Sequence, residues 1–257
     1  MMKIYVVRRK HLMWAAGVLV ALAIFCTVNV PVALEASVAT RQLPIYCVDR
    51  QDNMLAISFD AAWGNEDTQQ LIDILAQYDV KTTFFVVGEW VEKYPESVRA
   101  LHEAGHEIMN HSNTHAHYNS LSAKEIIADV NACNDKIEAI TGVRPTLIRC
   151  PYGEYDDHVI VAIRSMGMEP IQWDVDSLDW KDLAATEIAK RVTGKVQSGS
   201  ICLFHNAALH TPEALPSILE FFKQNGYTIV PISQLLLSGE YYMDHTGKQC
   251  PSDNANA

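Results

Sequence analysis

Apolar and polar positions alternate along most of the chain with two different periods. From Met54 onward, short β-rich apolar runs are followed by longer stretches whose apolar residues recur with helical spacing. The predicted strands span residues 55–59, 82–87, 107–110, 146–149, 170–175, 200–204 and 228–230. The predicted helices span residues 66–78, 95–103, 123–140, 157–166, 185–196 and 212–224. About seven βα-like units in one continuous domain indicate an α/β fold, either a barrel or a doubly wound parallel sheet, with the helices outside.

Several of the predicted helices carry signals at their ends. Ser122 can cap the helix that starts at residue 123, and Glu125 three residues later completes a capping box. Four predicted helices are followed by a glycine, which readily ends a helix, at positions Gly105, Gly142, Gly167 and Gly226. The polar C-terminal tail, residues 241–257, is expected to be loose.

The first 39 residues differ in pattern from the rest of the chain. Four basic residues between positions 3 and 10 precede a run from Leu12 to Val30 that contains no ionised side chain. As a helix this run would span roughly 28 Å, close to the thickness of bilayer hydrocarbon. Residues 1–39 are therefore predicted to be an N-terminal signal anchor, or a signal peptide, with a short linker. The protein is expected outside the cytoplasm, held by this membrane helix or secreted if the leader is cleaved.

The charge balance narrows the class of partner. Without the four leader cations the chain has 16 basic and 31 acidic residues, a formal charge of −15. Such an acidic chain is a poor partner for nucleic acid. Cysteines occur at positions 26, 47, 133, 150, 202 and 250 with no CxxC pair, so no zinc knuckle is predicted. An oxidising exterior would permit a bridge, for example between Cys47 and Cys250, but sequence alone does not define the pairing.

Chemically capable side chains follow the predicted strands. Asp60 directly follows the first strand, where a carboxylate is also a common turn or helix-cap residue. His111 and His115 follow the third strand, and one helical turn would direct imidazoles at positions i and i+4 toward one ion. Exposed loop histidines are common, so the pair taken alone is compatible with two interpretations, a metal site and an ordinary surface loop.

Three more such residues lie at the ends of later strands. Arg149 ends the fourth strand, Asp179 follows the fifth, and His205 closes the sixth. Each also has a structural interpretation, as a surface ion pair, a helix cap or a strand-end histidine. Because the catalytic groups of a barrel gather where strands end and loops begin, their joint occurrence favours one site.

Five segments in this order resemble the motifs of one enzyme family. They are SFDA at 58–61, HSNTH at 111–115, RCPYG at 149–153, DSLDW at 176–180 and LFH at 203–205. They resemble the NodB-homology polysaccharide deacetylases, carbohydrate esterase family four, over about residues 54–237. The form SFD-x-x-WG at 58–64 is most similar to the PdaB-type, sporulation-linked branch. The resemblance implies a distorted (β/α) barrel of about seven parallel strands with outer helices, over a domain spanning residues 48–240.

The resemblance also implies a role for each matching residue. Asp60 would be the base that deprotonates a water on an ion held by His111 and His115. Arg149 would hold that base in place and keep it ionised.

The remaining motif residues would complete the reaction. Asp179 would orient His205, which would protonate the sugar nitrogen. The amide N–H of Tyr152 would be an oxyanion donor, and Trp180 and Leu203 would wall the acetyl pocket.

One position departs from the family pattern. Ala61 stands where the family usually has a second Asp that is the third metal ligand. The resemblance implies one divalent ion, zinc first and cobalt, nickel or manganese as alternatives, with its third protein ligand undefined. The two histidines would then be joined by waters alone or by a further ligand such as Asn113 or Asp60.

The expected function is metal-dependent hydrolysis of N-acetyl groups on a cell-wall amino-sugar polymer, such as peptidoglycan or chitin-like oligomers, with release of acetate. The expected partners are this N-acetylated polysaccharide and, through the N-terminal helix, a membrane. Two alternatives stay open. One is a catalytically silent wall-binding protein with a degenerate metal site, and the other is an O-acetyl esterase that acts on another polysaccharide.

Overall fold

The computed structural model describes residues 10, 13, 14, 18 and 41–252. The chain divides into two compact units, Met1–Arg41 and Gln42–Ala257. The predicted anchor or signal peptide, residues 1–39, therefore lies outside the described residues apart from four positions. Within the part of the chain that is described, no helix is long and apolar enough to span a membrane.

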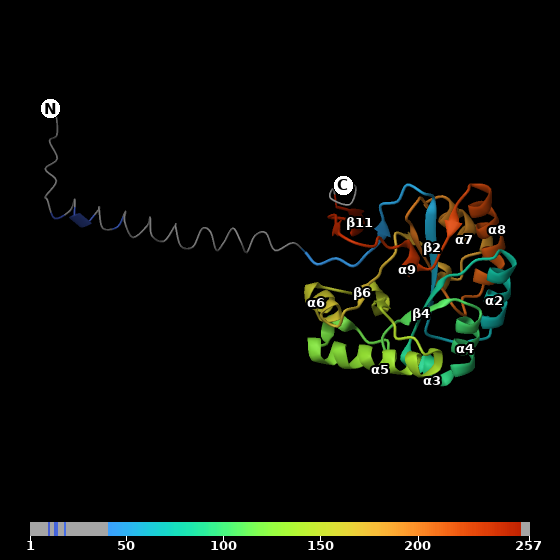
Figure 1. Ribbon diagram of the computed structural model, residues 1–257, viewed down its shortest axis with the longest axis horizontal. Coiled ribbons are helices and arrows are strands. Elements are labelled where there is room, and N and C mark those ends of the chain that lie inside the picture. Colours follow the sequence, from blue (N-terminus) through green and yellow to red (C-terminus); the bar gives the residue numbers. More distant parts are fainter. Residues whose placement is uncertain (1–9, 11–12, 15–17, 19–40, 253–257) are drawn as a thin grey trace, which may run out of the picture. The chain divides into compact units, whose positions relative to one another are not determined.

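Strands and helices alternate along the second unit (Figure 1). The described strands are β1 (Cys47–Val48), β2 (Met54–Ala61), β3 (Thr83–Val86), β4 (Glu107–Asn110), β5 (Leu147–Ile148), β6 (Glu169–Pro170), β7 (Val175–Asp176), β8 (Ile201–His205), β9 (Thr228–Ile229), β10 (Tyr241–Met243) and β11 (Lys248–Pro251). The described α-helices are α2 (Thr68–Gln77), α3 (Gly88–Lys93), α4 (Pro95–Glu103), α5 (Ala123–Thr141), α6 (Asp157–Ser165), α7 (Ala185–Thr193), α8 (Thr211–Gln224) and α9 (Ile232–Leu235). Short 3-10 turns cover Tyr118–Ser120, Pro151–Gly153 and Asp179–Lys181.

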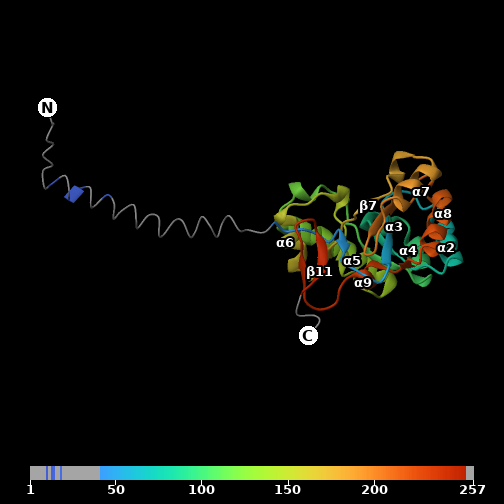
Figure 2. The ribbon, with the colours of Figure 1, turned by 90° about the horizontal axis from the view of Figure 1, so that it is seen from above.

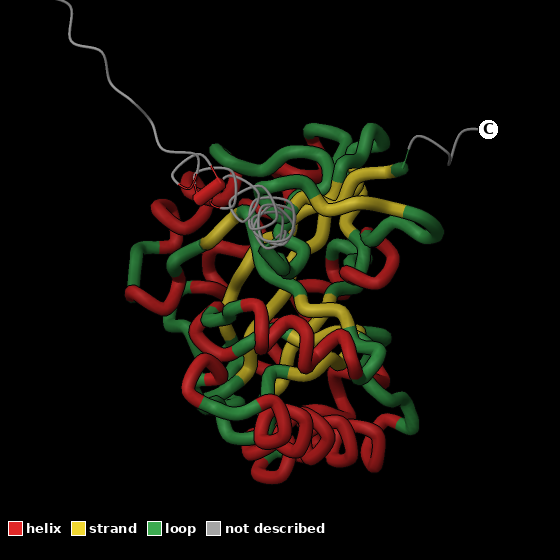
Figure 3. Tube along the Cα trace, turned by 90° about the vertical axis from the view of Figure 1, so that its left-hand side faces the viewer, coloured by secondary structure: helices red, strands yellow, loops and turns green. Residues whose placement is uncertain are grey.

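Seven parallel strands curl into a half-barrel with helices on its outside. The strand order is β6-β5-β4-β3-β2-β8-β7, and β9 pairs with the start of β2. Neighbouring helices contact one another in the order α7, α8, α2, α4, α5, α6, so the helical layer follows the strands. Figure 3 shows the strands inside and the helices around them. The predicted barrel-like α/β fold of about seven parallel strands is confirmed.

The central strand β2 is buried on both faces, as expected for a parallel strand covered by helices. Its odd-numbered residues, from Leu55 to Ala61, pack in the main apolar core beneath the helices. Ala56, on the other face, packs in a second core inside the half-barrel. Because side chains alternate along a strand, Asp60 shares the inner face with Ala56, at the open end of the half-barrel.

One predicted strand is wrong. Residues 170–175 do not form one strand, because β6 pairs with β5 at one edge of the sheet and β7 pairs with β8 at the other. The backbone between them crosses from edge to edge and pairs with the segment before β1. Ile45 accepts a backbone hydrogen bond from Gln172 at 2.7 Å and forms a parallel bridge with Ile171. Residues 45–48 thus pair with the backbone that follows β6 and, through Cys47 and Val48, with the residues just before β8.

The predicted helix ends are confirmed where they depend on local chemistry. Ser122 and Glu125 form the capping box of α5. Gly142 ends the same helix in the left-handed conformation, at φ 73°. The pattern missed α3 and α9, which are six and four residues long and too short to show a helical period.

The expectation of a loose tail is wrong for residues 241–252. They form β10 and β11, which make a three-stranded sheet with β1 in the order β1-β11-β10. Figures 1 and 2 both show β11 on the α6 side of the unit, away from α2 and α8. Cys47 and Cys250 lie in this sheet and are buried free thiols, as are the other described cysteines, Cys133, Cys150 and Cys202. Cys26 lies outside the described residues.

Candidate active site

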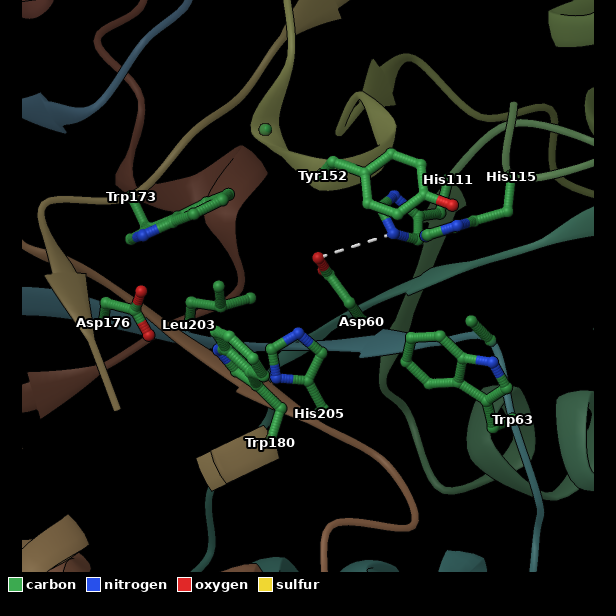
Figure 4. A pocket seen from close by; sticks show the side chains of 12 residues that line it. Asp60, Trp63, His111, His115, Tyr152, Trp173, Asp176, Trp180, Leu203 and His205 are labelled. Atoms are coloured by element: carbon green, nitrogen blue, oxygen red, sulfur yellow. Dashed lines mark ion pairs between the residues drawn. The ribbon is translucent and has the colours of Figure 1, made fainter. Parts of the chain in front are cut away.

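A cavity of about 480 Å³ opens at the carboxyl ends of the strands (Figure 4). It brings together seven of the nine residues that the sequence singled out, and the other two, Arg149 and Asp179, lie directly behind it as hydrogen-bond partners of lining residues. Its lining consists of Asp60, Ala62, Trp63, His111, His115, Tyr152, Gly153, Trp173, Asp176, Trp180, Leu203 and His205.

Asp60 is a buried carboxylate at the end of β2. Its Oδ1 accepts a hydrogen bond from Arg149 Nη1 at 2.7 Å, and its Oδ2 lies 3.6 Å from His111 Nε2 (Figure 4). Burial raises the pKa of Asp60, but the nearby positive charge, above all that of Arg149, outweighs burial and holds the pKa below its usual value. Asp60 is therefore ionised, with one oxygen still able to accept a proton.

Arg149 is fully buried behind this carboxylate. Besides Asp60, its guanidinium donates through Nη2 to Ser58 Oγ at 2.9 Å and to the Gln172 carbonyl at 3.1 Å. The guanidinium carbon also lies 4.3 Å from the centroid of the Phe85 ring. These contacts fix the cation, which in turn fixes the orientation of the Asp60 carboxylate.

The two predicted metal ligands converge, but not through a helix. Residues 111–115 form a loop after β4, in which Ser112 and His115 have φ values of 70° and 54°. Asn110 Oδ1 accepts a hydrogen bond from the Ser112 amide at 2.7 Å, and Ser112 Oγ accepts one from the His115 amide at 2.8 Å. This turn brings the rings of His111 and His115 to 5.0 Å between centroids. The prediction that one helical turn carries the two histidines is wrong. The two imidazole rings nevertheless lie close together, as predicted.

The protonation of the two imidazoles suits a divalent ion. His111 Nδ1 donates to the Arg149 carbonyl at 2.7 Å, since a carbonyl can only accept, and this leaves Nε2 with a free lone pair. Burial lowers the pKa of both histidines, and that of His115 falls to about 4. Both rings are neutral near pH 7, as metal ligation requires. His111 and His115 therefore fit as two protein ligands of one ion.

The third protein ligand has no clear place. Ala61 packs in the main apolar core and is not part of the cavity lining. Asn113, one of the open alternatives, does not line the cavity: its buried Oδ1, which has no hydrogen-bond partner within the described residues, lies against Gly88. Within residues 41–252 no group of three His, Cys, Asp or Glu side chains is placed to hold a metal. The donor set is thus two imidazoles, with Asp60 beside them.

His205 lies at the end of β8 and is held by a buried carboxylate. Its Nδ1 pairs with Asp179 Oδ1 at 2.8 Å, and its amide donates to Asp179 Oδ2 at 2.8 Å. Thr211 Oγ1 donates to the same Oδ2 at 2.7 Å. Burial lowers the pKa of His205, but the hydrogen bond and charge of Asp179 outweigh it and raise the pKa above its usual value. The Asp179 carboxylate thus favours the protonated form of His205, and Nε2 is the ring nitrogen left for the cavity.

The predicted oxyanion donor, Tyr152, and the two predicted wall residues, Trp180 and Leu203, all line the cavity. Tyr152 has a left-handed φ of 59°, and its ring meets the His115 ring edge-on at 4.5 Å and stacks on His117 at 4.2 Å. Trp180 is half exposed, whereas Leu203 is buried. The oxyanion role of the Tyr152 amide stays a prediction.

Sequence reasoning gave no site role to three large or charged lining residues, Trp63, Trp173 and Asp176. Trp63 lies within the SFD-x-x-WG form at 58–64 and Asp176 begins the fourth motif, so the sequence held a signal for both. Trp173 lies in the backbone crossing between β6 and β7, which the sequence pattern did not reveal.

Comparisons with known proteins agree with this geometry. Residues 48–171 match the family described as polysaccharide deacetylase. The peptidoglycan-N-acetylmuramic acid deacetylase PdaC of Bacillus subtilis is 37% identical over 189 residues, which are 73% of this chain and 40% of PdaC. The chain thus spans less than half the length of this curated relative.

Two solved structures resemble the chain in fold. The Bc1960 peptidoglycan N-acetylglucosamine deacetylase is 28% identical with a TM-score of 0.72, over 74% of this chain and 91% of that one. BA3943 of Bacillus anthracis, described as a CE4 family pseudoenzyme, is 33% identical with a TM-score of 0.72, over 75% of this chain and 68% of that one. A mutant of BA3943 is described as having restored enzymatic activity. The five motifs, the half-barrel and these similarities together show that the chain belongs to the CE4 polysaccharide deacetylase (NodB) family.

Proposed function

We propose that this chain hydrolyses N-acetyl groups on an amino-sugar polymer of the cell wall and releases acetate. The observation that carries the proposal is the presence of a proton acceptor and a proton donor in one cavity. Asp60, ionised by Arg149, is an acceptor for a proton, and His205, charged through Asp179, is a donor of one. Amide hydrolysis requires both, because a water must lose a proton and the departing amine must gain one.

The residues of the chain divide the reaction between them. Asp60 Oδ2 takes a proton from the attacking water, and Arg149 keeps that carboxylate ionised until it does so. His205 Nε2 gives its proton to the sugar nitrogen as the carbon–nitrogen bond breaks, while Asp179 stabilises the imidazolium beforehand. The amide of Tyr152 is the proposed donor to the oxyanion.

The proposed cofactor is one divalent ion, zinc first, held by His111 and His115. When bound there it supplies Lewis acidity toward the water and the acetyl carbonyl. The neutral state of both imidazoles and the hydrogen bond from His111 Nδ1 to the Arg149 carbonyl support this choice of ligands.

The proposed substrate is N-acetylated peptidoglycan or a chitin-like oligomer, because PdaC and Bc1960 carry the names of peptidoglycan deacetylases. The form of residues 58–64 supports the PdaB-type, sporulation-linked branch. The basic and then apolar leader supports a position outside the cytoplasm with a membrane helix.

A specific observation favours a second function, that of a silent wall-binding protein. Ala61 supplies no metal ligand, and BA3943, which this chain resembles at 33% identity, is described as a pseudoenzyme. A site with only two imidazoles binds an ion less firmly than a three-ligand site.

Acetate release separates the two functions. The full chain should release acetate from N-acetylated peptidoglycan or from chitin oligomers when zinc or cobalt is added, and a chelator should stop the release. His205→Ala should lower the rate on the amide substrate, since it removes the proton donor. Acetylated xylan, a polymer of O-acetyl esters, is the matched comparison for an esterase. If no polymer releases acetate with any metal, the result would favour the catalytically silent wall-binding function.

The pH profile gives a second prediction, on Asp179→Asn. His205 acts while protonated, so its raised pKa keeps the reaction active up to that pKa and the activity falls as pH rises through it. Removing the Asp179 charge lowers that pKa, and the alkaline limb of kcat/KM should move about one to three pH units lower. Asp182→Asn, at an exposed position on the same segment, is the control and should leave the limb in place. An unmoved limb in Asp179→Asn would assign it to another group.

A further inference from the structure

The proposed reaction does not use Trp63, an exposed aromatic residue at the cavity. Its side chain is 59% exposed and is part of the cavity lining. A Trp buries more apolar surface than most residues when it is covered, so an indole left open beside a cavity indicates a surface that a ligand can cover.

The backbone that carries this indole is firmly held. Trp90 Nε1 donates to the Gly64 carbonyl at 2.6 Å and to the Trp63 carbonyl at 3.2 Å. Asn206 Nδ2 donates to the same two carbonyls, and its Oδ1 accepts from the Ala62 amide at 3.3 Å. Asn206 follows His205 directly in the chain, so the Trp63 turn is tied to the segment of the proposed acid. A backbone held in this way does not have to be ordered when the indole binds a ligand.

Trp63 lies across the reacting groups from the other aromatic lining residues. Figure 4 shows Trp63 on one side of Asp60 and His205, with Trp173 and Trp180 on the other. Its ring centroid lies 5.7 Å from that of His115, at an angle of 62°. A group bound against Trp63 would therefore lie beside the point where the acetyl group reacts, next to the imidazole pair.

The chemistry of the rim selects the kind of group. No Lys or Arg side chain is part of the cavity lining, so the Trp63 indole offers a flat apolar face with no lysine or arginine charge beside it in the cavity. A pyranose ring presents a neutral face of C–H groups that covers such an indole, with its hydroxyls left in water.

We infer that Trp63 forms a carbohydrate subsite for the sugar adjacent to the one that loses its acetyl group. The identity of the reacting sugar rests on the proposed function. With this subsite the cavity binds oligomers more tightly than a single sugar, because a single N-acetylated sugar in the cavity leaves the indole uncovered.

The test compares Trp63→Ala and Trp63→Tyr in the full chain. Acetate release is measured on β-1,4-linked N-acetylglucosamine oligomers of increasing length. Oligomer binding is measured by calorimetry in an Asp60→Asn background, in which turnover is expected to be slow enough for a binding measurement. Trp63→Ala should weaken binding of the longest oligomer about tenfold and leave the shortest nearly unchanged. Trp63→Tyr should restore most of this loss, because it keeps an aromatic face. Val161→Ala, at an equally exposed apolar residue on α6 outside the cavity lining, is the control and should change neither.

The outcomes separate the subsite from the reaction. If acetate is released and the Trp63→Ala variant keeps the chain-length dependence of the unmodified protein, the subsite is refuted and the reaction stands. If no acetate is released but oligomers bind in a Trp63-dependent way, the subsite stands and the reaction fails. If the unmodified chain neither binds oligomers nor releases acetate, both fail.

Discussion

Asp60→Asn should lower the rate of acetate release by about 10²- to 10⁴-fold, the usual contribution of a general base. The amide oxygen of Asn can still accept the hydrogen bond from Arg149 that Asp60 accepts now at 2.7 Å. The substitution therefore removes the charge that takes a proton from water while it keeps the shape of the cavity. The measurement is kcat/KM for acetate release from a chitin oligomer with added zinc, at the pH optimum of the unmodified protein.

A matched surface substitution tests whether the loss is local. Asp73→Asn, on the exposed face of α2, should leave the rate unchanged. Far-ultraviolet circular dichroism of Asp60→Asn should match that of the unmodified protein, which separates lost chemistry from lost structure. A rate in Asp60→Asn within a few-fold of the unmodified one would mean that another group accepts the proton, and the assignment of the base would be wrong.

The elements that place these residues could be predicted because their signals are local. The helix predicted over 95–103 coincides with α4, and the capping pair of Ser122 and Glu125 marks the start of α5. Strand ends then put Asp60 and His205 at the same edge, since β2 and β8 are parallel neighbours with these two residues in register.

The crossing between β6 and β7 could not be predicted from the same pattern. Residues 170–175 alternate apolar and polar side chains as one strand would, and this pattern does not tell which neighbour each half will pair with. The pairing depends on the segment around Ile45, more than a hundred residues earlier, which bridges to Ile171. Trp173, a lining residue, was missed for this reason.

Side-chain direction at the ends of elements was the other gap. The i and i+4 spacing of His111 and His115 is one that a helix would satisfy, but the left-handed φ values at Ser112 and His115 replace that helix by a turn. Similarly, the motif pattern placed residue 61 beside the ion, whereas strand alternation turns Ala61 into the main core. The spacing of residues along the sequence identified which residues belong to the site. The backbone conformation at each position determines the direction of its side chain.

Arg149→Met should be the most destabilising single substitution at the site. The guanidinium is fully buried and is the hydrogen-bonded cation that compensates the buried charge of Asp60. Removing one partner of a buried ion pair costs about 3–5 kcal/mol, because the other charge is left uncompensated. Arg149→Lys should not restore this stability, since one ammonium cannot reproduce the forked contacts to Asp60, Ser58 and the Gln172 carbonyl. Urea unfolding at pH 7, followed by circular dichroism, measures the free energy of unfolding.

Arg144→Met is the matched control, because Arg144 is also an ion-paired arginine, with Asp135 and Glu138, but lies exposed at the surface. Its loss should change the free energy of unfolding by no more than about 1 kcal/mol.

The pH dependence of the free energy of unfolding identifies why the loss of Arg149 destabilises the fold. With Arg149 present the pKa of Asp60 is lowered, so this pair stabilises the fold above the unfolded pKa of an aspartate and the stabilisation is lost as pH falls through the folded pKa. Without Arg149, burial alone raises the pKa of Asp60, and protonation relieves the uncompensated charge. The difference in stability between the Arg149→Met variant and the unmodified protein should therefore shrink as pH is lowered, whereas a difference that stays constant with pH would point to lost packing against Phe85 instead of lost charge compensation.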